Sequence, residues 1–366
     1  MALKDFNFRI TLIDKYIIKK FLSTFFVALL LIIGIVIIFD ISEKIDHFVD
    51  SNAPLGLVIK YYCNFVPYFS NMFSSLFVFI TVIFFTSKLA GNSEIVAILA
   101  GGISFKRLMY PYFISAAIIA VFSLTLNLWV IPPANKSRLA FEKKYVKDKY
   151  KEFGRNMHYQ IKPGVFMYAE SFNPTYNTAY DFTLESIENN RIVSKLSADQ
   201  AQWDSLKQCW NLKQYHLRKF VGDWQKVEVG ESMDTSIVIT VEDFYRRQNI
   251  VEQLNFHELN ELIDMQKLRG DQMVKYALIE KHTRFAMPFS AFILTLIGVS
   301  LSSKKRRGGI GLNIGIGIAL SFSYILFLRF SQMFVHTGAL PPGLALWLPN
   351  IIYAAIAAFL YRIAPK

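Results

Sequence analysis

Apolar and polar residues follow one another along this chain in long blocks. Three strongly apolar segments come first, a mostly polar stretch runs from Pro132 to about Thr283, and three more apolar segments complete the chain. A helix that rises 1.5 Å per residue needs roughly 20 apolar residues to cross a hydrocarbon core of about 30 Å. The segments that meet this requirement are Leu22–Phe39, Phe65–Ser87, Leu108–Ile131, Phe285–Leu301, Ile310–Val335 and Leu344–Tyr361. The pattern therefore predicts an α-helical polytopic membrane protein with six transmembrane helices, arranged 3+3 around an inserted domain.

The polar insert alternates apolar and polar residues with a period of two, which is typical of β-strands. The expected strands are Val165–Tyr168, Tyr180–Leu184, Trp210–Leu212 and Ile237–Val241. Turn signals separate them: Lys162-Pro163-Gly164, Asn173-Pro174, Glu188-Asn189-Asn190 and Val221-Gly222-Asp223. Their short spacing favours a sandwich or a β-jellyroll. A strand that lines an apolar, lipid-holding interior and a strand in a packed core would use the same residues.

Helices are expected on both sides of these strands. One is expected to continue the third span from Lys136 to Lys151, and Asn255-Phe256-His257-Glu258 has the form of a capping box for a short helix to about Arg269. The predicted domains are therefore residues 1–131 with the first three spans, 132–283 with the β-jellyroll and its flanking helices, and 284–366 with the last three spans.

Lys and Arg residues in the short connections predict the orientation, because cytoplasmic loops carry an excess of these cations. They lie before the first span, between the second and third, between the fourth and fifth, and at the end of the chain: Lys4, Arg9, Lys15, Lys19, Lys20, Lys88, Lys106, Arg107, Lys304, Lys305, Arg306, Arg307, Arg362 and Lys366. The acidic Asp40-Ile41-Ser42-Glu43 after the first span differs from a signal-peptide cleavage site. We expect an inner-membrane protein with both termini in the cytoplasm and a periplasmic insert.

Composition and motifs exclude several classes of function. The net charge of +12 is largely explained by these anchoring clusters, so a nucleic-acid partner gains little support. The sequence has no G-x-x-x-x-G-K-[ST] phosphate loop, no G-x-S-x-G motif and no histidine at metal-ligand spacing. We therefore expect no catalytic residue, metal or cofactor in this chain. Cys63 and Cys209 can be bridged or can be two small packing residues, and no disulfide framework follows from them.

The connection between the second and third spans has the composition of a short helix of mixed polarity beneath the membrane, at about residues 92–104. Asn92 can cap it, Glu94 suits its positively polarised start, and Gly101-Gly102 can end it. Two interpretations remain open from composition. The helix is a docking element, with Glu94 meeting a basic group and Ala97, Ala100 and Gly101 permitting close approach, or it is only an interfacial connector.

Several local patterns, in this order, carry a family resemblance. They are Ile13-Asp14-Lys15-Tyr16, the run Glu94 to Ser104, Trp129-Val130-Ile131-Pro132-Pro133, Pro288-Phe289 and Arg307-Gly308-Gly309-Ile310-Gly311. Along almost its whole length the chain resembles the permease family of the lipopolysaccharide exporter, LptF/LptG, also called YjgP/YjgQ, with the LptG-like member slightly favoured by the short insert and Phe39-Asp40.

The resemblance implies a subunit of an ABC transporter that extracts lipopolysaccharide from the inner membrane. The implied partners are a cytoplasmic LptB-like ATPase, a sister permease in a heterodimer, a single-span LptC-like protein and a periplasmic LptA-like jellyroll protein. It also implies that residues Glu94, Ala97, Ala100, Gly101, Gly102 and Ser104 form the ATPase coupling helix. Head-group candidates are Arg329, the one ionisable residue well inside a span, and Lys44, Lys136 and Arg138 near the outer surface.

Two other functions remain open. An ABC permease for a lipoprotein or peptide would differ in the placement of its spans, often one before the large domain and three after. A membrane-anchored scaffold that binds a ligand without transporting it would need a cytoplasmic output domain, and no cytoplasmic segment here is long enough to fold alone.

Overall fold

The computed structural model describes residues 10–146, 155–173, 176–189, 191–205, 207–221, 224–235, 237, 241, 248–268, 270–271, 273–303 and 309–364. The chain divides into two compact units. The helical unit comprises Met1–Lys147, Glu252–Phe256 and Leu278–Lys366, and the β unit comprises Asp148–Val251 and His257–Ala277. Each unit is considered by itself.

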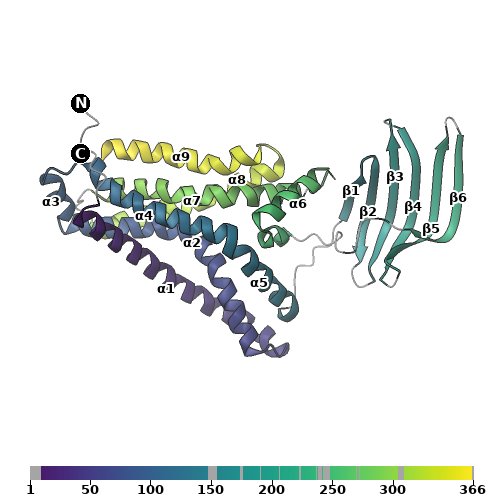
Figure 1. Cartoon of the computed structure of the whole chain (residues 1–366), viewed down its shortest axis with the longest axis horizontal. Coiled ribbons are helices and arrows are strands. Elements are labelled where there is room, and N and C mark those ends of the chain that lie inside the picture. The colour runs from purple at the N-terminus through teal and green to yellow at the C-terminus, as the bar shows by residue number, and fades with distance from the viewer. Residues whose placement is uncertain are drawn as a thin grey trace. The chain divides into compact units, whose positions relative to one another are not determined.

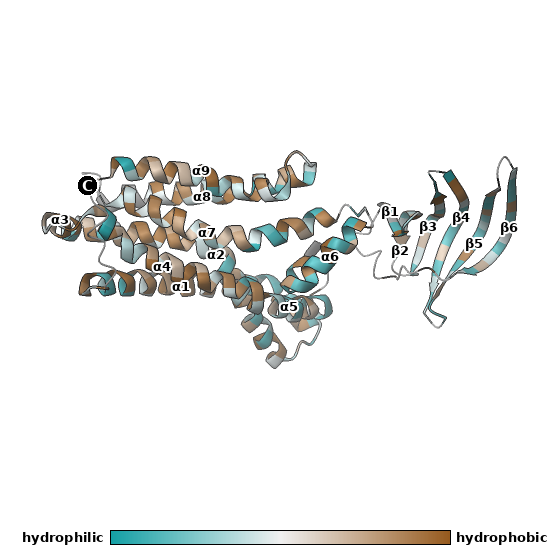
Figure 2. Cartoon of the chain, turned by 45° about the horizontal axis from the view of Figure 1, so that its top comes forward, coloured by the Kyte–Doolittle hydropathy of each residue, from teal (hydrophilic) through white to brown (hydrophobic). Residues whose placement is uncertain are grey.

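Long helices make up the helical unit (Figure 1). They are α1 (Leu12–Asp50), α2 (Leu55–Gly91), the short α3 (Glu94–Ala100), α4 (Phe105–Thr125), α5 (Ile131–Tyr145), α7 (Val274–Ser302), α8 (Gly309–Thr337) and α9 (Pro342–Ile363). A π-helical turn, η2 (Leu126–Val130), makes α4 and α5 continuous. Among the described residues, six helical stretches are long and apolar enough to cross a membrane, and each overlaps one of the six predicted spans. Figure 2 shows the apolar residues spread along them.

The spans differ in how deeply they are buried. In the most apolar stretch of α2 and of α7, 61% of the residues are buried, against 22% for α1. Small residues let α2 and α7 approach closely: a Cβ atom added at Gly298 would lie 2.7 Å from Val82 Cγ1. Ser75 and Ser290 form a hydrogen bond of 2.7 Å between the same two helices. Close backbone approach and interhelical polar bonds are the usual means of helix association in lipid. Helices α2 and α7 therefore form the centre of the bundle.

The helical unit has two ends that the rest of the description uses. The α3 end holds α3, the start of α1 and the end of α9 (Figure 1). The α1–α2 end holds the turn between α1 and α2, which Asn52 makes with a positive φ of 48°.

The described residues of the β unit form a six-stranded antiparallel sheet with its strands in sequence order. The strands are β1 (Arg155–Lys162), β2 (Val165–Asn173), β3 (Thr178–Glu188), β4 (Arg191–Asp204), β5 (Cys209–Val221) and β6 (Trp224–Thr235). One face carries the core, with Met157, Met167, Phe182, Leu196 and Leu212 all buried. An antiparallel β domain inserted between two sets of three spans was predicted, and it is confirmed.

The predicted turn signals fall between consecutive strands. Lys162-Pro163-Gly164 joins β1 to β2, where Gly164 has a φ of +78° and would bring a Cβ atom to 2.6 Å from the Ile187 carbonyl oxygen. Such a position accepts only glycine without strain. The fourth hairpin, between Asp204 and Cys209, has no strong turn sequence and was not predicted.

Two predictions at the borders of the β unit need correction. The helix expected to reach Lys151 ends at Tyr145, because Val146 adopts an extended conformation with φ −105° and ψ 115°; residues 147–151 lie outside the described part of the chain. Of the strand expected at Ile237–Val241, residues 238–240 lie outside the described part of the chain, and neither Ile237 nor Val241 belongs to a strand. The other flanking helix is α6 (Phe256–Leu268), which is followed by Gly270 with a φ of +64°.

Candidate functional site: the α3 surface and the α1–α2 groove

Helix α3 is a separate seven-residue helix between α2 and α4. Ser93 reverses the chain in front of it with a left-handed φ of 62°, and Gly102 does so behind it with a φ of 87°. Asn92 was predicted to cap α3, but α2 continues to Gly91 and Ser93 takes the capping position. Asn92 Nδ2 instead donates to Glu94 Oε1 at 3.2 Å. Two tight turns therefore set α3 apart from the spans.

Contacts with the start of α1 hold this connection in place. The Tyr16 hydroxyl donates to Glu94 Oε2 at 3.3 Å. Beside it, Arg107 on α4 donates from two nitrogens to the two carboxylate oxygens of Asp14, at 2.7 and 2.5 Å. Asp14 also closes a capping box with Thr11, whose backbone nitrogen lies 2.7 Å from Asp14 Oδ2. Helices α1, α3 and α4 are thus tied together at the α3 end by polar bonds.

The exposed side of α3 carries most of the residues predicted to dock a partner. Ile95 is fully buried and anchors the helix, while Val96 is 53% exposed. Ala97, Ala100, Gly101, Gly102 and Ser104 are exposed as well, and Glu94 is half-buried. Ser104 also accepts a hydrogen bond from the Arg107 backbone nitrogen, which caps α4. A surface of small exposed residues on an anchored helix can admit another helix or a groove at close range. We call these residues, Glu94, Val96, Ala97, Ala100, Gly101, Gly102 and Ser104, the α3 surface.

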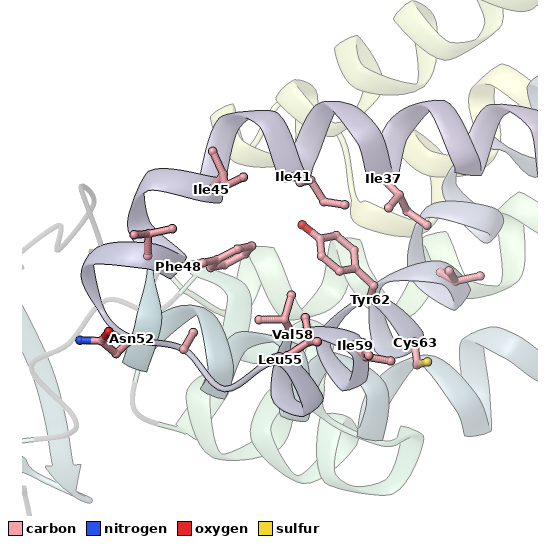
Figure 3. Close-up of a pocket in the computed structure, with 13 residues that line it drawn as sticks. Ile37, Ile41, Ile45, Phe48, Asn52, Leu55, Val58, Ile59, Tyr62 and Cys63 are labelled. Carbon is pink, nitrogen blue, oxygen red and sulfur yellow. The ribbon is translucent and has the colours of Figure 1, made fainter.

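An apolar groove lies at the other end of the helical unit, between α1 and α2 (Figure 3). It has a volume of about 850 Å³. The side chains that line it are Ile37, Ile41, Ile45, Phe48, Val49, Asn52, Ala53, Leu55, Val58, Ile59, Tyr62, Cys63 and Val66. Its size is within the range of small-molecule pockets, and apolar surface of this kind favours aliphatic ligands. Cys63 is a free, exposed thiol in this groove, and Cys209 is a free, half-buried thiol in the β unit.

The four cations predicted to meet a head group fall into two pairs. Arg329 is exposed on α8 near the exposed apolar side chains Leu326 and Met333, and its guanidinium donates to Gln332 Oε1 at 3.3 Å. Lys136 is exposed on α5. Lys44 and Arg138, in contrast, are held by carboxylates of the same unit. Contact of any of the four with a head group stays a prediction.

Several site residues were missed from the sequence although weak signals for them exist. Asp14 follows Thr11 at capping-box spacing, and Glu142 follows Arg138 at the i,i+4 spacing of a helical ion pair. Neither pattern says which other helix its charge meets. Glu252 had no signal at all, since it lies in the short stretch between the sheet and α6. Burial and the neighbouring Glu280 carboxylate raise the pKa of Glu252, against the lowering effect of Arg138.

The comparison with known families covers nearly all of these elements. The family described as Lipopolysaccharide export system permease LptF/LptG matches residues 15–363. This range holds the spans, α3, the groove and the β insert, although it does not separate LptF from LptG. No curated protein matches the chain. With six apolar helices around an antiparallel β insert and a family match along nearly its whole length, this chain is a multi-pass inner-membrane protein that belongs to the lipopolysaccharide export system permease family LptF/LptG.

Proposed function

We propose that this chain is the permease subunit of an ABC transporter that extracts lipopolysaccharide from the inner membrane and passes it through its β unit towards the outer membrane. The family match along both the bundle and the β insert carries the proposal. Because the sequence has no phosphate-binding loop, ATP is hydrolysed on a separate LptB-like ATPase. A sister permease completes a heterodimer, and LptC-like and LptA-like proteins receive the lipid.

The distribution of cations supports an orientation with the α3 end in the cytoplasm. Lys15, Lys19 and Lys20 lie at the start of α1, and Lys88, Lys106 and Arg107 flank α3. An excess of Lys and Arg marks cytoplasmic connections. In this orientation both termini are cytoplasmic, the groove opens in the outer half of the membrane, and the β unit is periplasmic.

The α3 surface is then the site that receives the motion of the ATPase. A coupling element must be accessible to its partner and stiff towards its own spans. Val96, Ala97 and Ala100 supply the accessible side. Buried Ile95, the Tyr16–Glu94 hydrogen bond and the Asp14–Arg107 pair supply the stiffness. Displacement of α3 is therefore passed to α1, α2 and α4 together.

The groove and Arg329 are the parts suited to the lipid. The groove is lined by aliphatic and aromatic side chains and can hold an acyl chain of the substrate. An exposed arginine among apolar side chains is costly in hydrocarbon unless an anion or a partner covers it, so Arg329 is the first candidate for a head-group phosphate. Lys136 is the second. Lys44 and Arg138 would have to leave their carboxylates to contact a phosphate.

ATP hydrolysis and lipopolysaccharide release in proteoliposomes test this proposal. The vesicles contain this chain, its sister permease and the ATPase. Glu94→Arg removes the acceptor for Tyr16 and reverses a charge on the α3 surface, and Ala97→Trp blocks close approach without changing charge. Ala140→Trp is the matched control, because Ala140 is an exposed alanine on α5 at the opposite end of the unit.

We expect both α3 variants to insert normally but to lose assembly with the ATPase or lipid release, while Ala140→Trp retains both. Unchanged assembly and release in Glu94→Arg and Ala97→Trp would reject the α3 surface as the coupling site. A wild-type assembly that hydrolyses ATP but releases no lipopolysaccharide would reject the substrate.

A further inference from the structure

Lys44 on α1 is surrounded by acceptors. Its ammonium nitrogen lies 2.7 Å from Asp40 Oδ1, 2.7 Å from the Tyr61 hydroxyl and 3.5 Å from Glu142 Oε1 on α5. Lysine has three N–H donors, so each donor has one acceptor here. The side chain is only 18% exposed. Lys44 thus joins three helices, and a phosphate could bind to it only by displacing one of these groups.

Arg138 on α5 joins a fourth segment to the same carboxylate. One terminal nitrogen donates to Glu142 Oε1 at 3.4 Å, and the other lies 3.8 Å from Glu252 Oε2. Its guanidinium also lies over the Tyr68 ring, 4.8 Å from the centroid. The Asn135 amide donates to the Glu252 carbonyl oxygen at 3.3 Å, which gives α5 a second bond to the same residue. Glu142 is therefore shared by Lys44 and Arg138.

These five residues, Asp40, Lys44, Arg138, Glu142 and Glu252, form what we call the ion cluster. Their place in the chain is specific: α5 leads out of the spans into the β unit, and Glu252 belongs to the segment by which the chain returns from it. The cluster ties both connections to α1, and through the Tyr61 hydroxyl, which donates to Glu142 at 2.9 Å, to α2.

The cluster also contacts the groove. Tyr62 lines the groove (Figure 3), and its hydroxyl donates to Asp40 Oδ2 at 3.0 Å. A ligand that pushes Tyr62 or separates α1 from α2 therefore acts directly on Asp40. A continuous series of polar contacts then runs from Tyr62 through Asp40, Lys44, Glu142 and Arg138 to Glu252.

The charges of the cluster do not favour an anion. Three carboxylates face two cations, so there is no positive excess to attract a phosphate. A buried ion pair contributes little net stability compared with apolar packing, but removing one of its two charges is costly. The best-established role of buried ion pairs is to fix how the segments that carry them align with one another. Positioning accounts for the arrangement better than head-group binding does.

We propose that the ion cluster is a clamp that positions the exit and return connections of the β unit on α1 and α2, with Glu142 and Arg138 as its central positioning residues. The clamp proposal rests on the proposed function. It adds to that function a route by which movement at the groove reaches the two connections.

The clamp is tested by lipid released per ATP hydrolysed in the full assembly with sister permease and ATPase. Glu142→Gln keeps the size of the side chain and removes its charge. We expect it to assemble and to hydrolyse ATP, but to release about tenfold less lipid per ATP, a fold-change within the usual range of coupling between sites. Lys143→Met is the matched control, since Lys143 is an exposed cation on the same helix, and it should leave this ratio unchanged.

A double variant separates a clamp from a phosphate ligand. In Lys44→Met/Glu142→Gln, Arg138 still pairs with Glu252, and Asp40 still accepts hydrogen bonds from the Tyr61 and Tyr62 hydroxyls. The clamp therefore predicts that the double variant releases more lipid per ATP hydrolysed than Lys44→Met alone. If Lys44 bound a phosphate, both variants would be equally inactive and the clamp would be overturned. Arg138→Lys provides a further variant in case a neutral one fails to fold, because it keeps the charge but loses the fork that reaches two carboxylates.

A distance measurement makes the test independent of the substrate. Spin labels at Ser42 on α1 and Ala140 on α5, in a chain with Cys63 and Cys209 replaced by serine, should give one narrow distance distribution in the wild type. We expect Glu142→Gln to broaden it and Lys143→Met to leave it unchanged. An unchanged distribution in Glu142→Gln overturns the clamp, whereas absence of lipid release from the wild-type assembly overturns only the proposed function.

Discussion

The Asp14–Arg107 pair gives the sharpest test of how the α3 end is held together. Asp14 Oδ1 accepts from Arg107 at 2.7 Å, and Oδ2 accepts from Arg107 at 2.5 Å, from the Thr11 backbone nitrogen at 2.7 Å and from the Thr11 hydroxyl at 2.9 Å. The Asp14 side chain is 4% exposed. Asp14→Asn removes the charge and replaces one carboxylate oxygen by an amide NH₂, which cannot accept the hydrogen bonds that these donors make.

The size of the effect follows from these contacts. Removing one partner of a buried ion pair costs about 3–5 kcal/mol, because the other charge is left without compensation. Two features reduce this cost here. The Arg107 side chain is 18% exposed, so water can solvate it in part, and the asparagine carbonyl oxygen can still accept from Thr11. We therefore expect a loss of roughly 2–4 kcal/mol in the free energy of unfolding.

Reversible unfolding of the chain in mixed detergent micelles, followed by circular dichroism, measures this loss. A double-mutant cycle with Arg107→Met isolates the pair: the double variant should lose no more than the larger of the two single losses. Asp234→Asn is the matched control, since Asp234 pairs with Lys207 on the exposed surface of the β unit and its loss should leave unfolding unchanged. A loss below about 1 kcal/mol for Asp14→Asn, or strictly additive losses in the cycle, would refute the reasoning.

Three further expectations follow from single observations. Burial and Glu280 raise the pKa of Glu252 above its ordinary 4.5, so the stability that Glu252 contributes is present below pH 4.5 and is lost as the pH rises through the raised pKa. Glu252→Gln should therefore flatten the dependence of the free energy of unfolding on pH above 4.5. Parallel curves for the variant and the wild type would contradict this. Gly298→Ala should lower stability by about 1–3 kcal/mol, because its Cβ would lie 2.7 Å from Cγ1 of the stiff Val82 side chain. The control Gly34→Ala meets nothing within 4 Å and should not lower stability. Equal effects of the two variants in thermal unfolding would show that α2 and α7 can separate freely. Lipopolysaccharide bound in the groove should slow the alkylation of Cys63 by a maleimide and leave the alkylation of Cys209 unchanged. Mass spectrometry measures both rates, and an equal Cys63 rate with and without lipopolysaccharide would show that the groove stays empty.

The spans could be predicted from the sequence because the requirement that sets them is one-dimensional. A hydrocarbon core of fixed thickness demands a run of apolar residues of fixed length, and Leu22–Phe39 meets that demand without reference to any other part of the chain. Hairpin turns such as Lys162-Pro163-Gly164 were equally local, since Gly164 supplies a positive φ that few residues tolerate. The turn after Asp204 has no glycine, although Gln208 adopts a positive φ of 54° there, and it was missed.

Features that depend on which helices meet could not be predicted in this way. Lys44 and Arg138 look like free cations in the sequence, because their carboxylates on other segments, Glu142 for Lys44 and Glu252 for Arg138, lie 98 and 114 residues away along the chain. The end of the helix after the third span was also misplaced. Charged residues continue past Tyr145 with good helix propensity, but Val146 turns the backbone into an extended conformation there.

The arrangement of polar contacts indicates which helix can move. Helix α1 is tied to its neighbours by charges near its start, through Asp14 and Arg107, and near its end, through Asp40 and Lys44. Between these ties its packing side chains are apolar, with Phe25 and Ile33 among the buried ones. Helix α2 is instead joined along its middle by directional bonds, such as Ser75 to Ser290 on α7 and Asn71 to Asn127 on η2. Apolar contacts slide at low cost, whereas a hydrogen bond in a low-dielectric interior must be broken. The α1–α2 groove should therefore widen by displacement of α1 while α2 stays with α7, and the ion cluster lies where that displacement begins.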